Sequence, residues 1–405
     1  MMPHARAFRS PPPVVGHTGG VTAGHWIAVV GGALIVGTVL ASALRTVVLP
    51  QGGLTGITRF VFACADRIFT SAGNRRPLPR RLAPLYAPAA LVSLPFAWCM
   101  LIAVGFAFVF WGLDVGSLGD AWVTSGSSLF TLGFARPEGV GLIWLTFVEA
   151  TIGLGIVALL ISYLPTLYTA YSAREQGVGM LSPITGSPPS PRQLLRRLDA
   201  ANALAGAGIW GQAASWFVAM HQSHTAFPAL SRFPPQDRER SWVATAGTVL
   251  DGAAIMISAV GHPLVDGPDE GDRRNELGAL VLTLAHGSSA LVEIAGAAGL
   301  PVENDPPTLL ELVGGLSNTP PSISIDREEY DETLEWLVHA GVVAPLDDPD
   351  RAWEHFRQIR SSYDTALRGL AGLTHAPPAP WSTDRALVVG RPRFFSKRPV
   401  AMREP

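Results

Sequence analysis

The stretch that decides the fold is Asp120–Arg136, with the sequence DAWVTSGSSLFTLGFAR. It lies between two apolar segments, Ala89–Leu113 and Gly139–Tyr171, and each is long enough to cross a bilayer. The first half of the stretch is compatible with a helix, and the second half combines glycine with small and aromatic residues. Non-helical backbone is tolerated at membrane depth only where it is buried in protein or lines a wet cavity. The sequence therefore predicts a short helix and a re-entrant loop between two membrane-spanning helices.

Charged residues make up 15% of the 405 residues, against ~25% in typical soluble domains. The deficit lies in three runs: Trp26–Leu49 has only Arg45, Pro84–Leu113 has no charge, and Gly139–Ser172 has only Glu149. A soluble core does not explain three such runs, so the sequence predicts an integral membrane protein whose partner is the lipid bilayer. The formal net charge of −2 implies no nucleic-acid partner.

Sequence patterns of enzymes and metal sites are missing. The chain has no phosphate-binding loop, no G-x-G-x-x-G after a strand and no nucleophile elbow, so we expect no enzyme. Two cysteines, Cys64 and Cys99, exclude a disulfide framework and a cysteine-rich zinc site. His221 and His224 have a spacing that allows two metal ligands on one helix face, but no third ligand is close in sequence. A cap or surface role is favoured for both.

Residues 128–135, SLFTLGFA, resemble the pore loop of potassium channels, in which a short helix leads into T-x-G-[YF]-G and backbone carbonyls face the ion. Thr131, Gly133 and Phe134 fit this pattern, whereas Ala135 replaces the second glycine and Arg136 replaces the acidic residue that usually follows. The segment from Leu82 to Glu175, under a quarter of the chain, resembles the module of two helices and a pore loop found in bacterial two-span channels.

The resemblance implies a filter whose backbone carbonyls coordinate potassium or another monovalent cation, with no other cofactor. One chain cannot enclose an ion, so four copies around an axis are implied. Glycine permits backbone of alternating hand, a threonine adds a side-chain oxygen, and an aromatic residue braces the loop. The implied filter and pore residues are Ser128, Thr131, Leu132, Gly133, Phe134, Ala135 and Arg136.

The two departures from the family pattern leave two hypotheses open. An alanine in the left-handed conformation costs about 1–2 kcal/mol, and four Arg136 side chains at an outer mouth would repel cations. One hypothesis is a tetrameric cation channel that is regulated by its cytoplasmic domain and an unidentified ligand or partner. The other is a non-conducting membrane-anchored sensor or scaffold that retains the channel fold. A re-entrant or interfacial turn is a simpler interpretation of the loop alone.

Four residues of the apolar segment Gly139–Tyr171 are candidates for pore support and bending. Glu149 is the ionisable group inside this span, so it faces either a wet cavity or the pore helix, for example Ser125 or Thr124. We favour the bracing role. The remaining candidates are Gly153, Gly155 and Pro165, which lie where pore-lining helices of the family commonly bend. The alternative for either glycine is that a small residue allows close helix packing.

The first apolar segment, Trp26–Leu49, is either a retained span or a signal peptide cleaved near Ala41-Ser42-Ala43. The following connection is rich in arginine, and the positive-inside rule places it in the cytoplasm, which favours the retained span. Apolar residues at helical spacing between Leu54 and Ile68 predict a helix on the inner membrane surface. The chain is thus expected in the plasma membrane, multi-pass, with its C-terminal domain in the cytoplasm.

The predicted fold class is an all-α membrane protein with a re-entrant pore loop and an α-helical cytoplasmic domain. Within the cytoplasmic domain, helices are predicted over Arg192–Ala205, Trp210–Met220, Ser241–Val260, Glu276–Gly299, Arg327–Ala340 and Arg351–Leu373. The predicted segments are a disordered tail (1–24), a first transmembrane helix with an interfacial helix (25–83), the pore module (84–175), a linker (176–191), the cytoplasmic domain (192–374) and a disordered tail (375–405).

Overall fold

The computed structural model describes residues 23–47, 56–57, 60–61, 64, 83–201, 203, 207–233, 235, 237, 240–260, 270–302, 322–374, 376–389 and 402–403. These residues are all-α apart from one antiparallel pairing of two-residue strands, β1 (Val388–Val389) with β2 (Met402–Arg403), which confirms the predicted all-α class. Of the described residues, those within Met1–Leu40 and Trp98–Ile156 form one compact unit, and those within Ala41–Ala97 and Val157–Pro405 form a second.

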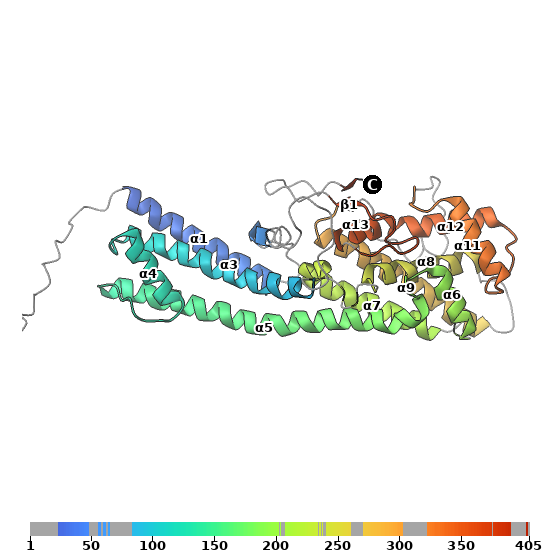
Figure 1. Ribbon diagram of the computed structural model, residues 1–405, viewed down its shortest axis with the longest axis horizontal. Helices are drawn as coiled ribbons and strands as arrows, with labels where there is room; N and C mark the ends of the chain where they lie inside the picture. Colours follow the sequence, from blue (N-terminus) through green and yellow to red (C-terminus); the bar gives the residue numbers. More distant parts are fainter. Residues whose placement is uncertain are drawn as a thin grey trace, which may run out of the picture. The chain divides into compact units, whose positions relative to one another are not determined.

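The first unit is built from the apolar helices, shown in blue to green in Figure 1. They are α4 (Leu118–Leu129) together with parts of three longer helices: α1 (Ala23–Val47) up to Leu40, α3 (Ala83–Gly112) from Trp98, and α5 (Val140–Thr185) up to Ile156. A capping box starts α4, because Ser117 Oγ accepts from the Asp120 N–H and the Asp120 carboxylate accepts from the Ser117 N–H. The short helix and the loop after it therefore lie between two long helices, as predicted.

Helices α1 and α3 approach each other through glycines. A Cβ atom placed on Gly32 would lie 2.3 Å from the carbonyl oxygen of Gly105, and one on Gly112 would lie 2.6 Å from the carbonyl oxygen of His25. Small residues allow such close packing of membrane helices. Ser42 and Ala43, at the candidate cleavage site, are buried.

Among the described residues, five helices are long and apolar enough to cross a membrane. The sequence predicted three of these spans, and the other two, α8 (Trp242–Val260) and α9 (Glu270–Ala297), belong to the second unit. Helix hydropathy therefore indicates a multi-pass membrane protein. The apolar window of α8 differs from the others because all of it is buried inside the protein.

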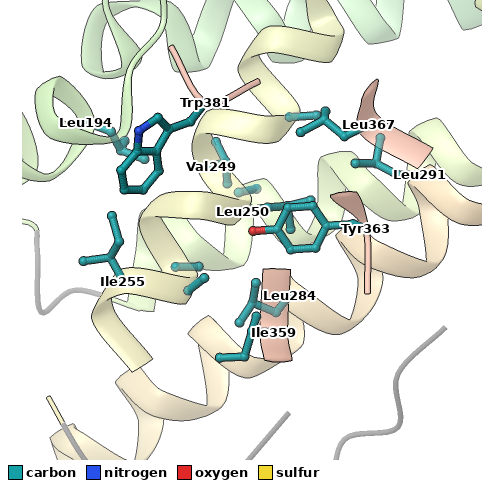
Figure 2. Close-up of a cluster of buried hydrophobic side chains, with 14 of the residues drawn as sticks. Leu194, Val249, Leu250, Ile255, Leu284, Leu291, Ile359, Tyr363, Leu367 and Trp381 are labelled. Carbon is teal, nitrogen blue, oxygen red and sulfur yellow. The ribbon is translucent and has the colours of Figure 1, made fainter. Parts of the chain in front are cut away.

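Helix α8 is the centre of the second unit, and Figure 2 shows part of the core around it, including Leu250, Leu284 and Tyr363. Every residue from 241 to 259 is buried. The surrounding elements are α6 (Pro191–Ala200), α7 (Ala207–Ala226), η1 (Pro228–Arg232), α9, α11 (Arg327–His339), α12 (Pro349–Ser361) and α13 (Asp364–Thr374).

A buried charge network ties α8 to the C-terminal helices. Arg360 of α12 forms an ion pair with Asp251 of α8, and its Nε lies 3.0 Å from Asp364 Oδ1. Tyr363 donates to Asp251 Oδ1 at 2.8 Å, and Arg360 Nη2 donates to the carbonyl oxygen of Trp381 at 2.8 Å. A buried ion pair is strongly destabilising when one partner is removed. The network therefore fixes how these helices pack.

The linker predicted over 176–191 is wrong for most of its length, because α5 continues to Thr185. Val178 and Leu181 are buried in the core of the second unit, and such packing stabilises a helix that composition alone does not favour. Pro183 lacks the N–H that would bond to the carbonyl oxygen of Gly179, and the Ser182 hydroxyl donates to that oxygen instead at 3.1 Å.

The disordered tail predicted from 375 is wrong for residues 376–389. Ala379, Trp381 and Leu387 are buried, and Arg385 forms an ion pair with Glu329 of α11. A few apolar anchors order this proline-rich segment, and composition averaged over the whole tail hides them. Residues 390–401 and 404–405 lie outside the described residues.

One further helix prediction is wrong, and two predictions fall largely outside the described residues. The single helix predicted over Arg351–Leu373 is two helices, α12 and α13, which meet at the residues that bond to Asp251. The N-terminal tail lies outside the described residues except for Ala23 and Gly24, which begin α1. The interfacial helix is described only at residues 56–57, 60–61 and 64, all of them helical.

Candidate pore loop

Helix α4 presents a buried hydroxyl face to its own unit. Thr124, Ser125, Ser127 and Ser128 are all buried, whereas its Trp122 is exposed. The Ser128 hydroxyl donates to the carbonyl oxygen of Thr124 at 2.9 Å, so it is satisfied within the helix. The remaining hydroxyls are free to reach other elements, and two of them do.

Ser127 organises the turn that follows α4. Its carbonyl oxygen accepts from the N–H of Leu132 at 2.8 Å and from the N–H of Gly133 at 3.4 Å. Its hydroxyl oxygen accepts from the N–H of Ala135 at 3.0 Å. The sequence analysis did not single out this residue, although the run Ser-Gly-Ser-Ser at the end of a predicted pore helix offered hydroxyls at the right place to hold the loop.

The loop backbone alternates in hand over its first residues. Thr131 has φ 54° and Gly133 has φ 72°, while Leu132 between them is not left-handed. Left-handed backbone is unusual for a β-branched residue such as Thr131, and backbone strain of this kind clusters at functional sites. Within the described part of the chain, the carbonyl oxygens from Thr131 to Phe134 accept no hydrogen bond. A row of backbone oxygens thus remains available to a ligand.

The alternation ends at Ala135, which does not have a positive φ. The predicted cost of a left-handed alanine is therefore not incurred, because the bond from Ala135 to Ser127 draws the backbone back toward α4. Phe134, expected to brace the loop, is 68% exposed, and Leu132 is 62% exposed. Neither side chain is braced by its own chain.

Arg136 and Glu138 are both exposed, and they form no ion pair with each other or with another described residue. Pro137 between them is buried. Glu138 therefore does not neutralise Arg136 within one chain. The positive charge of Arg136 stays at the end of the loop.

Glu149 ties three helices together. Its Oε1 lies 2.5 Å from Ser125 Oγ of α4, and the same hydroxyl lies 3.0 Å from the carbonyl oxygen of Ala103 of α3. Glu149 itself belongs to α5 and is fully buried. This geometry agrees with the favoured bracing role, and one of the two predicted partners, Ser125, is the one that bonds.

The two glycines of α5 have different surroundings. A Cβ atom on Gly153 would lie 2.2 Å from the carbonyl oxygen of Leu129, so only glycine allows α5 to approach the end of α4 this closely. A Cβ atom on Gly155 would meet nothing within 4 Å. Gly153 is thus a packing residue, whereas Gly155 lies on the open side of the helix.

Helix α5 has two opposite faces below Glu149. One is a buried stripe that includes Gly153, Ile156, Tyr163 and Leu167. At about 100° per residue, the opposite side is a stripe of small and hydroxyl residues, all exposed: Thr151, Gly155, Ala158, Ser162, Pro165, Thr166 and Thr169. We call these seven residues the hydroxyl stripe. Its Thr and Ser hydroxyls donate to carbonyl oxygens of the preceding turn, which leaves their oxygens as acceptors.

His221 and His224 of α7 have different surroundings. His221 is partly exposed and its Nε2 lies 2.8 Å from Glu293 Oε2. His224 is fully buried, its Nδ1 lies 3.0 Å from the carbonyl oxygen of Met220, and its ring lies 5.3 Å from that of Trp242. Burial, and secondarily the charge of Arg174, lowers the pKa of His224 to about 3. No group of three His, Cys, Asp or Glu residues that could hold a metal exists among the described residues.

Comparisons of the chain with family models, with curated proteins and with solved structures found no match. The functional interpretation therefore depends on the loop, its supporting contacts and the hydropathy of the helices.

Proposed function

We propose that the protein is a tetrameric, potassium-channel-like membrane protein that conducts monovalent cations through the loop after α4. The observation that carries the proposal is the loop backbone: Thr131 and Gly133 are left-handed, and the carbonyl oxygens up to Phe134 are unused. A cation that leaves water needs such a set of oxygens to replace its hydration shell. Four loops around an axis supply it.

Three helices, α1, α3 and α5, cross the plasma membrane in this proposal, and α8 does not. Helix α8 is enclosed by other helices of its unit, and its Asp251 pairs with Arg360 of α12. A helix that is already covered on all sides has no surface left for lipid. The arginine-rich connection before α3 then lies in the cytoplasm, as does the helical domain.

Exposed apolar residues support assembly of several chains. Leu132 and Phe134 of the loop are exposed in one chain, and neighbouring exposed apolar side chains of this size often mark an interaction site. On α5, large apolar residues flank the hydroxyl stripe: Leu154, Val157, Ile161, Leu164 and Tyr168. In a tetramer the hydroxyl stripe lines the water-filled pore, and the large residues contact lipid or a neighbouring chain.

The second candidate function is a non-conducting sensor or scaffold that retains the channel fold. Arg136 is the observation that favours it, since four unpaired guanidinium groups at the end of the loop repel cations. The same tetramer is expected, and only conduction differs.

Potassium flux into liposomes that contain the purified protein tests the proposal. We expect flux above that of empty liposomes and loss of flux on Gly133→Val, because valine does not tolerate φ 72°. Gly37→Val in α1 is the matched control, since a Cβ atom on Gly37 meets nothing within 4 Å and the residue belongs to neither the loop nor the hydroxyl stripe. Absence of flux in the wild type, with a tetramer present by mass, contradicts the channel and favours the scaffold. A monomer or dimer contradicts both.

A further inference from the structure

The segment Phe227–Phe233, which contains η1, lies along one side of α5. Ala229, Leu230 and Phe233 of the segment are buried together with Tyr163 and Leu167 of α5, and Phe227 is partly buried against them. The ring of its first residue meets the Tyr163 ring edge-on at a centroid distance of 5.6 Å, and the ring of its last residue lies 6.1 Å from that of Tyr171. The contacts therefore extend over about two turns of the helix.

Arg174 of α5 binds the C-terminal part of the segment. This side chain is buried, and its Nη1 and Nη2 donate to the carbonyl oxygens of Leu230 and Phe233 at 3.0 and 3.2 Å. Its Nε donates to Glu175 at 2.9 Å, so the buried charge is paired. Because a carbonyl that loses a buried, charged donor is left unsatisfied, Arg174 fixes the register of the segment on α5.

Pro165 lies between the points of contact. It has no N–H to donate to the carbonyl oxygen of Ile161, so the helix lacks one bond there and bends most easily at this position. Pro165 itself is on the exposed hydroxyl stripe, opposite the segment. Tyr163 precedes it and Arg174 follows it, and both are held by the same seven residues.

The part of α5 that follows Arg174 also packs closely against the helical domain. A Cβ atom on Gly177 would lie 2.1 Å from the indole of Trp216 in α7, and Leu181 is part of the core. The helical domain therefore contacts α5 directly on both sides of the proline, without a flexible linker in between.

We propose that Phe227–Phe233 limits the bending of α5 at Pro165, and that the helical domain controls this bending through the segment. We call the segment the splint. This inference depends on the proposed function only in one respect, namely that α5 lines the pore. The segment connects α7 to α8, so a rearrangement of these helices withdraws the splint, lets α5 bend at Pro165 and changes the width of the inner pore. Arg174 is a positioning residue in this device.

Amide hydrogen exchange of the full chain in lipid nanodiscs tests the splint without requiring conduction. We expect Arg174→Ala to raise the exchange of amides 161–169 by about tenfold, because two buried hydrogen bonds to a charged group are lost. In the Pro165→Ala background the missing helical bond is restored, so the same substitution should raise exchange far less. Arg197→Ala is the matched control, since Arg197 donates to the carbonyl oxygen of Pro183 at 2.7 Å from an exposed position away from the splint.

Each outcome decides one question. An equal rise in both backgrounds, or a rise confined to α7 and α8, overturns the splint. If Arg174→Ala unfolds the domain, the comparison is repeated with Arg174→Lys and with Phe227→Ala, which weaken one end each. Potassium flux is measured on the same variants. Absence of flux in all of them, with the expected exchange pattern, contradicts the channel and leaves the splint standing, whereas normal flux with no exchange difference overturns the splint alone.

Discussion

The hydroxyl oxygen of Ser127 accepts a hydrogen bond from the backbone N–H of Ala135 at 3.0 Å, although eight residues separate them. This contact joins the last turn of α4 to the far end of the loop. It also explains why the alternation of backbone hand stops after Gly133, since Ala135 turns back toward the helix. The loop is therefore closed at both ends by one serine.

Ser127→Ala should loosen the loop while leaving the helix intact. The lost hydrogen bond is worth about 1 kcal/mol in each chain, and the four losses act on one filter. We expect potassium selectivity over sodium to fall, measured as the ratio of the two fluxes into liposomes. Ser128→Ala is the control, because that hydroxyl donates only to the carbonyl oxygen of Thr124 in its own helix. Unchanged selectivity in Ser127→Ala contradicts the role of this serine.

Gly153→Ala should disturb the packing of α5 on α4. Its Cβ would lie 2.2 Å from the carbonyl oxygen of Leu129, and over-packing of this kind costs about 1–3 kcal/mol. We expect a lower melting temperature in detergent and a smaller tetramer fraction by mass. Gly155→Ala, two residues away on the open side, should leave both unchanged. Equal effects of the two substitutions contradict the difference in their surroundings.

Substitution of Arg136 should affect ion entry more than substitution of Ala135. Arg136→Asp removes a positive charge from each loop and adds a negative one, and fields of this kind change local cation concentration by about tenfold or more. We therefore expect a clear rise in potassium flux. Ala135→Gly should have little effect, since Ala135 is not left-handed and glycine relieves no cost there. A larger gain from Ala135→Gly contradicts this ranking.

The hydroxyl stripe predicts which side of α5 faces water. Ser162→Cys should react with an aqueous thiol reagent and block flux, whereas Ile161→Cys, its neighbour on the large apolar side, should react slowly and leave flux intact. Both are compared in a background with Cys64→Ser and Cys99→Ser, because these two positions carry the chain's own thiols. Block at Ile161→Cys but not at Ser162→Cys places the pore on the other side of the helix.

His224 makes the second unit sensitive to acid. Its pKa is lowered to about 3, whereas a histidine in an unfolded chain has a pKa of about 6.5. Below pH 6.5 the unfolded state binds a proton that the folded state does not, so stability falls by up to about 1.4 kcal/mol per pH unit until the folded pKa is reached. His224→Phe keeps a ring beside Trp242 and should flatten the melting temperature between pH 6.5 and 4. Ser215→Ala should keep the wild-type slope, because Ser215 is an exposed residue of α7 whose hydroxyl donates to the carbonyl oxygen of Gly211.

Hydropathy and spacing along the sequence determined where the long apolar helices lie, that a short helix and loop stand between two of them, and that the rest is helical. These features depend on residues close together in the chain, and local rules describe them well. The same rules favoured a bond from Glu149 to the pore helix, with Ser125 and Thr124 as the examples, and Ser125 is the residue that bonds.

Only the tertiary structure decided the conformation of three segments that local composition predicted wrongly. Residues Gly177–Thr185 remain helical because Val178 and Leu181 enter a core built from distant segments, and Trp381 orders a proline-rich segment by packing near Arg360. Ala135 avoids the left-handed region because of a serine eight residues earlier. In each case a contact with a residue elsewhere in the fold outweighs the conformational preference of the segment, and such a contact exists only once the chain has folded.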